Sequence, residues 1–96
     1  MMPDSLGYYT VAVTKVVQIG NSIGVVVNKQ FFEATPFSIG DQVDVYAQLD
    51  GHARMKVGTG KSLLRIGLSS IAVTFDHSNF TIKDRKVVVY LKEYSE

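Results

Sequence analysis

The stretch that decides the fold is Thr14-Lys15-Val16-Val17-Gln18-Ile19-Gly20-Asn21-Ser22-Ile23-Gly24-Val25-Val26-Val27. Its two apolar runs are dominated by β-branched residues, which are enriched in strands. The residues between the runs, Gly20-Asn21-Ser22, are typical of a turn. Because the β-branched character already begins at Tyr9, the pattern predicts a β-hairpin over residues 9–27.

One short helix is predicted directly after this hairpin. Asn28 is a favourable N-cap residue for a helix over residues 29–34. The helix is expected to end before Pro36, because the residue that precedes a proline disfavours the helical conformation.

The rest of the chain has the alternating apolar and polar positions of half-buried strands. Strands are expected at residues 43–49, 52–57, 63–66, 71–75 and 87–91. Asp50-Gly51 is a typical hairpin turn between the first two of these strands. The prediction is a mostly β fold with one short helix, in a single domain over residues 9–96 that follows a flexible arm at residues 1–8.

The composition excludes several classes of protein. The chain has 96 residues, the size of one domain, and 46% of them are hydrophobic, which argues against disorder. It has no cysteine, which excludes disulfides, thiolate metal sites and a cysteine nucleophile. No apolar run reaches the roughly 20 residues that span a bilayer, and no secretory signal is evident. We therefore expect a cytoplasmic protein that does not associate with membranes.

The second half of the sequence resembles the first half. Residues 16–25 align with residues 63–73 if one residue is inserted. The further correspondences are Phe32 with Phe80, Ile39-Gly40-Asp41 with Ile82-Lys83-Asp84, and Val43, Val45 and Tyr46 with Val87, Val89 and Tyr90. A duplication would give two units, at about residues 9–57 and 61–93, that pack into one barrel with pseudo-two-fold symmetry. Chance similarity between short apolar strands is the alternative explanation.

Residues 14–57 resemble the SpoVT/AbrB-type domain of MazE-like antitoxins and AbrB-like transition-state regulators. The resemblance rests on the Gly20-Asn21-Ser22 turn after a strand, the helical segment Lys29-Gln30-Phe31-Phe32, the segment Ile39-Gly40-Asp41-Gln42-Val43-Asp44-Val45 and the Asp50-Gly51 turn. It implies a swapped-hairpin β-barrel, which the family builds from two chains of about one unit each. It also implies double-stranded DNA as the ligand, for a transcription regulator or for an antitoxin whose tail grips a toxin. With a degenerate second copy at about 61–93, this one chain would form the whole barrel.

A DNA-binding face is expected on the two hairpins. DNA affinity comes mainly from cations that meet phosphates, and bases are read by Arg, Lys, Asn or Gln side chains in a groove. The candidate residues are Lys15, Gln18, Asn21 and Ser22 in the first unit and Lys61, Arg65, Ser69 and Ser70 in the second. A DNA-binding function predicts one exposed face that gathers Lys15, Gln18, Asn21 and Arg65.

A protein-interaction module that has lost DNA binding is the alternative function. The family often has a basic residue where Val26 stands and Lys or Arg where Val17 and Gln18 stand, and it commonly has a proline at the position of Asn28. The net charge of the chain is only +1. A third hypothesis is a structural subunit, so the chain is expected to be a monomer or a homodimer.

Three further cations lie near the start of the last predicted strand, at Lys83, Arg85 and Lys86. Charges on a turn or an edge strand oppose edge-to-edge aggregation, and this is the first interpretation of the group. Contact with phosphates is the second.

No enzyme activity, cofactor or metal site is predicted. His52 and His77 are far apart in the sequence, and no recurring ligand spacing surrounds them. A catalytic triad would need Ser69 or Ser70 as the nucleophile, His77 as the base and Asp84 as the acid, but nothing in the sequence fixes such a geometry.

Overall fold

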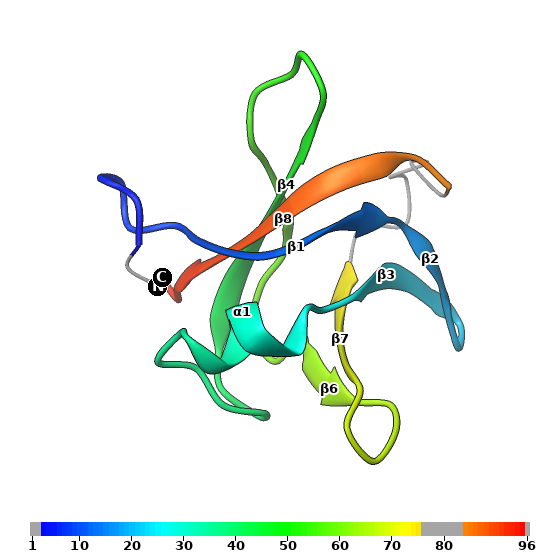
Figure 1. Cartoon of the computed structure of the whole chain (residues 1–96). Coiled ribbons are helices and arrows are strands. Elements are labelled where there is room, and N and C mark those ends of the chain that lie inside the picture. The colour runs from blue at the N-terminus through cyan, green and yellow to red at the C-terminus, as the bar shows by residue number, and fades with distance from the viewer. Residues whose placement is uncertain (1–2, 76–83, 96) are drawn as a thin grey trace.

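The computed structural model describes residues 3–75 and 84–95 of the chain. These residues form two antiparallel four-stranded sheets and one short helix (Figure 1). The mostly β fold with one short helix is therefore confirmed. Within the described residues the hydrogen bonds join the strands into two sheets, and they do not show one closed barrel.

No helix in the described part of the chain is long and apolar enough to cross a membrane.

The first sheet contains the longest strands of the molecule. In spatial order its strands are β1 (Tyr9–Lys15), β8 (Lys86–Glu93), β4 (Val43–Leu49) and β5 (Met55–Gly58). Alternate residues of β8 point to opposite faces. Val87, Val89 and Leu91 are buried on the inner face, whereas Val88 and Lys92 are only half-buried on the outer face.

The second sheet contains both short hairpins. In spatial order its strands are β2 (Val17–Ile19), β3 (Ser22–Val26), β7 (Ile71–Phe75) and β6 (Leu63–Arg65). The sequence pattern predicts one hairpin over residues 9–27, but the chain bends at the buried Val16 and passes from the first sheet to the second. The backbone N–H of Val16 donates to the Arg85 carbonyl at 3.1 Å, which ties this corner to the segment before β8.

Helix α1 (Lys29–Glu33) follows β3 as predicted. The Asn28 side chain accepts a hydrogen bond from the Phe31 N–H at 3.0 Å, so the predicted N-cap is confirmed. The helix ends at Glu33, and its C-cap residue Ala34 lies two residues before Pro36. Phe32 is buried and holds the helix against the core.

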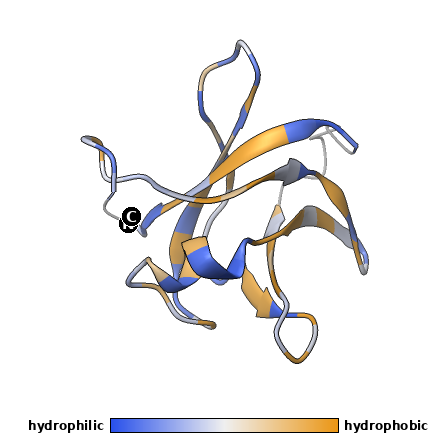
Figure 2. Ribbon diagram, viewed as in Figure 1, coloured by the Kyte–Doolittle hydropathy of each residue, from blue (hydrophilic) through white to orange (hydrophobic). Residues whose placement is uncertain are grey.

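One cluster of buried apolar side chains joins the two sheets. It is built mainly of valines, and Figure 2 shows β8 as one of the apolar strands that supply it. Val11 and Val16 enter it from the first part of the chain, and Val73 and Leu91 enter it from the second. Neither half of the chain thus encloses a core of its own.

The strand registers relate the two halves of the chain by an approximate two-fold axis. Tyr46 pairs with Tyr90 where β4 meets β8, and Val25 pairs with Val73 where β3 meets β7. These are corresponding residues in the sequence alignment of the two halves. Corresponding residues face each other in this way only where they lie next to a two-fold axis. The strand orders have the same symmetry. If each strand is replaced by its counterpart (β1 by β5, β2 by β6, β3 by β7, β4 by β8, and the reverse), every strand keeps the same neighbours in its sheet.

A pair of β-bulges follows the same symmetry. Val11 is the extra residue between β1 and β8, because Thr10 and Ala12 oppose consecutive residues of β8. Val57 is the extra residue between β5 and β4 for the same reason. Strand β5 thus corresponds to β1, which places the boundary between the two units in the β4–β5 turn. The structure differs here from the sequence alignment, which places β5 in the first unit and the boundary between residues 57 and 61.

The segment before β1 packs on the outer face of the first sheet. The ring of Tyr8 meets the ring of Tyr46 edge to face at 4.9 Å, and the Arg54 guanidinium lies 4.2 Å from the Tyr8 ring centre. Arg54 also forms an ion pair with Asp4 at 2.6 Å. Within the predicted arm at residues 1–8, Asp4 and Tyr8 are therefore in contact with the rest of the protein, and residues 1–2 lie outside the described residues.

Candidate nucleic-acid interface

The two hairpin turns lie at opposite ends of the second sheet. Ile23 pairs with Phe75 at one end of the β3–β7 ladder, and Val26 pairs with Ala72 at the other. The β2–β3 turn extends beyond the first end, whereas the β6–β7 turn extends beyond the second, as Figure 1 also shows. Arg65 is therefore separated from Asn21 along the strands of the sheet, and the structure does not bring the two hairpin tips together.

The β2–β3 hairpin presents a polar tip. Gln18, Asn21 and Ser22 are all exposed. The Gln18 side-chain amide donates to the Gly20 carbonyl at 2.8 Å, which braces the turn. Gly20 has a φ of 58°, a left-handed conformation that glycine adopts without steric cost. Side-chain amides are thus exposed on a two-stranded ribbon.

The β6–β7 hairpin presents an apolar tip. Leu68 is fully exposed, and Ile66 is 44% exposed. The Arg65 guanidinium donates to the Leu68 carbonyl at 3.2 Å, while Ser69 and Ser70 are exposed beside it. Lys61, the remaining predicted contact of this unit, is exposed just before β6. Arg65, Ser69 and Ser70 therefore flank an apolar projection, whereas Lys61 lies at the other end of β6.

The structure brings three cations together at the end of β1 and the start of β8. Lys15 and Lys86 are register partners across the two strands, and Arg85 directly precedes Lys86. All three side chains are exposed, and we call this group the basic corner. Like charges on directly opposed residues of a sheet destabilise it, so this arrangement favours an anionic partner.

The basic corner lacks a neutralising ion pair among the described residues. Within residues 3–75 and 84–95 the ion pairs are Lys29–Glu33, Arg54–Asp4 and Lys56–Asp44. Along the sequence, the acidic residue nearest to Arg85 and Lys86 is the exposed Asp84. Its backbone N–H donates to the Val16 carbonyl at 2.8 Å. The corner and Asp84 together retain a formal charge of +2, from three cations and one carboxylate.

The opposite end of the first sheet has a different charge. The two-fold axis that relates β4 to β8 places Asp41 and Gln42 where the other end has Arg85 and Lys86. Lys61 occupies the position that corresponds to Lys15. The backbone N–H of Val43 donates to the carbonyl of Gly60, the residue before Lys61, and this contact corresponds to the pairing of β8 with β1 beside Lys15. One cation and one carboxylate give these three positions a formal charge of zero, and Glu93, which pairs with Val43, adds a second carboxylate at this end.

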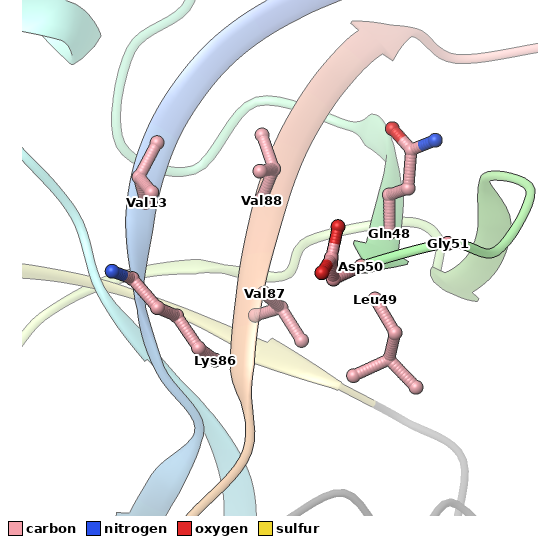
Figure 3. Close-up of a pocket in the computed structure, with 8 residues that line it drawn as sticks. All are labelled: Val13, Gln48, Leu49, Asp50, Gly51, Lys86, Val87 and Val88. Atoms are coloured by element: carbon pink, nitrogen blue, oxygen red, sulfur yellow. The ribbon is translucent and has the colours of Figure 1, made fainter.

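A hollow of about 510 Å³ lies beside the basic corner. Val13, Val87, Val88 and Leu49 supply its apolar lining. Figure 3 shows the Lys86 side chain on the β1 side of β8 and the Asp50 carboxylate on the opposite side. An anion would therefore meet Lys86 on the β1 side, away from Asp50.

The described residues contain no group of three or more His, Cys, Asp or Glu side chains that could hold a metal ion. His52 is exposed in the β4–β5 loop. His77 lies outside the described residues, so the structure does not describe the arrangement of His77 with Ser69 or Ser70 and Asp84. The repeat residues Phe80, Ile82 and Lys83 lie outside them as well.

No protein-family model, curated protein or solved structure matches this chain. The assignment of a function therefore depends on the residues and their arrangement.

The fold brings together cations that lie far apart in the sequence. From the sequence, the first interpretation of Arg85 and Lys86 is that their charges oppose edge-to-edge aggregation. Their link to Lys15 depends on the pairing of β1 with β8, which are separated by most of the chain. The only sequence signal for this site is the cluster of cations before the last predicted strand.

Proposed function

We propose that this protein is a small double-stranded-DNA-binding regulator of the AbrB/MazE type, either a transcription regulator or an antitoxin. The basic corner carries this proposal, since Lys15 and Lys86 stand opposite each other with Arg85 beside them. Three exposed cations at one corner fit the phosphate backbone of nucleic acid, which supplies most of the affinity in such complexes.

The proposed fold type is a swapped-hairpin β-barrel built by one chain. The self-paired residues Tyr46–Tyr90 and Val25–Val73 support this interpretation, and so do the matching bulges at Val11 and Val57. A duplication predicts all four features, whereas a chance similarity of strands predicts none of them. One chain then supplies both of the units that the family takes from two.

The β2–β3 hairpin is the proposed reading element. A two-stranded ribbon fits the major groove, and Asn and Gln side chains can form hydrogen bonds with base edges there. Gln18 and Asn21 are exposed on this hairpin. The chain passes from Lys15 through Val16 directly into β2, so the basic corner and the ribbon belong to one continuous segment.

A binding titration over a series of salt concentrations tests the proposal. Fluorescence anisotropy of a labelled duplex of about 20 base pairs should show binding that weakens as salt increases. The Lys15→Gln/Lys86→Gln variant should reduce the slope of log K against log salt by about 1.8, since each phosphate contact contributes about 0.9. Lys61→Gln is the matched control and should leave the slope unchanged.

The folded state of each variant is verified by urea unfolding before titration. Absence of binding to any duplex at low salt by the folded wild-type protein would overturn the proposal. The same result would favour the alternative, a barrel that has lost DNA binding and acts as a protein-interaction module. A slope for Lys15→Gln/Lys86→Gln equal to that of the wild-type protein would exclude the basic corner as the binding site.

A further inference from the structure

The β6–β7 hairpin carries a leucine that nothing in the described structure covers. Leu68 is 100% exposed at its tip, and Ile66 beside it is 44% exposed. The corresponding tip of the β2–β3 hairpin is polar, with Asn21 and Ser22. Large apolar side chains that protrude together typically mark an interaction site, so the two hairpins serve different contacts.

A hollow of about 420 Å³ lies next to this leucine. Phe32, Phe37 and Ile71 supply the apolar part of its lining, and Leu68 contributes to its wall. Arg65 from β6 lines it as well, and so do Glu33 and Lys29 from α1, which form an exposed ion pair at 3.7 Å. The same surface therefore carries an apolar projection, a partly apolar recess and charges of both signs.

We propose that two copies of this chain associate through this surface, with Leu68 of each copy seated in the hollow of the other. A two-fold interface requires a surface that is complementary to itself. A projection directly beside a recess with an apolar wall meets that requirement, because one rotation fills both recesses at once. Association also removes two fully exposed leucines from water, which is favourable.

The charges at the hollow support a second copy as the occupant. The Arg65 guanidinium is bonded to the Leu68 carbonyl, so it accompanies the leucine into the recess of the other copy. Glu33 lines that recess. Arg65 of one copy then approaches the partner's Glu33, and the two-fold axis forms the same contact a second time.

This inference does not depend on DNA binding. The β6–β7 turn lies at the opposite end of the second sheet from the β2–β3 turn, so the dimer leaves the polar tip of each copy free. In this arrangement the predicted DNA contacts Arg65, Ser69 and Ser70 are interface residues.

The first experiment measures the mass of the full chain by sedimentation equilibrium between micromolar and millimolar concentration. The wild-type protein should form a dimer, and Leu68→Ser should raise the dissociation constant at least about 100-fold, because a buried leucine is lost from each copy. Leu6→Ser is the matched control, since Leu6 is also exposed, at 67%, but has no part in the hollow. A wild-type monomer at millimolar concentration, or an unchanged dimer in Leu68→Ser, would overturn the inference.

The second experiment tests the charges by mixing two variants. Glu33→Arg alone and Arg65→Glu alone should both be monomers, since each homodimer opposes like charges at both contacts. An equimolar mixture should form a heterodimer, because both of its contacts then join opposite charges. A contact between these residues within one chain could not be restored by mixing, so a mixture that stays monomeric would contradict the proposed arrangement.

Discussion

The two ends of the first sheet share one backbone arrangement and differ in charge. One end has Lys15, Arg85 and Lys86, and the corresponding end has Lys61, Asp41 and Gln42. The two hairpins differ in the same way, with a polar tip on β2–β3 and an apolar tip on β6–β7. Repetition of the backbone thus does not imply repetition of the function.

Burial explains why the backbone is repeated and the surface is not. The corresponding pairs Val11–Val57 and Val25–Val73 are identical and buried. A change of volume inside a close-packed core costs stability. The residues at the sheet ends and hairpin tips contact mainly solvent, so they were free to take up different charges and polarities.

The largest predicted difference between the halves lies at the centre of the second sheet, where Gly24 corresponds to Ala72. A methyl group added at Gly24 would lie 2.1 Å from the carbonyl oxygen of Val73, which is too close. We expect Gly24→Ala to reduce the free energy of unfolding by about 3 kcal/mol or more. Ala72→Gly should reduce it by about 1–2 kcal/mol, from lost burial and a more flexible unfolded chain.

Urea unfolding of both variants measures this difference. Equal losses at the two positions would show that the centre of the sheet tolerates side chains equally in both halves, contrary to the β3–β7 contact described above.

An intermediate effect is predicted for a variant that gives the Asp41–Gln42 end of the first sheet the residues of the basic corner. Asp41→Arg/Gln42→Lys reproduces beside Lys61 the cations that Arg85 and Lys86 place beside Lys15. At low salt, titration with a short labelled duplex should then give two binding sites for each chain, compared with one in the wild-type protein.

The control adds the same charge at scattered exposed positions, through Ser5→Lys, Gln30→Lys and His52→Lys. It should tighten binding in general while the number of sites remains one. A stoichiometry of one for the Asp41→Arg/Gln42→Lys variant would mean that three adjacent cations do not suffice to make a site.

The smallest predicted effect concerns the segment before β1, which is present in one half only. The pKa of Asp4 lies below its ordinary value of 3.8, chiefly because the hydrogen bond from the Tyr8 N–H favours the ionised form. Burial opposes this shift, and the Leu6 N–H and Arg54 add to the lowering. The contribution of Asp4 is therefore complete above about pH 4 and is lost as the pH falls through the lowered pKa.

Chemical shifts of the Tyr8 ring should follow this titration while the strands keep their circular dichroism. Asp4→Asn should remove the step. A step of the same size in Asp4→Asn would assign it to another carboxyl group.

Local features were predictable from the sequence because their causes are local. Asn28 was identified as the helix cap, the turn at Asp50-Gly51 is present, and the correspondence of Tyr46 with Tyr90 was visible in the alignment. The basic corner was not predictable, since a like-charged neighbour for Lys15 arises only when β8 pairs with β1. The bend at Val16 was not predictable because no glycine or proline interrupts residues 9–19.

The sequence by itself determined the β-rich class, the single short helix and the repeat, because alternation, capping and turn residues act over a few positions. The tertiary structure decided which strands are neighbours, and thereby that the hairpin tips point apart and that cations from both ends of the chain share one corner. These contacts depend on register between distant segments, and register follows from burying all apolar faces in one core at the same time.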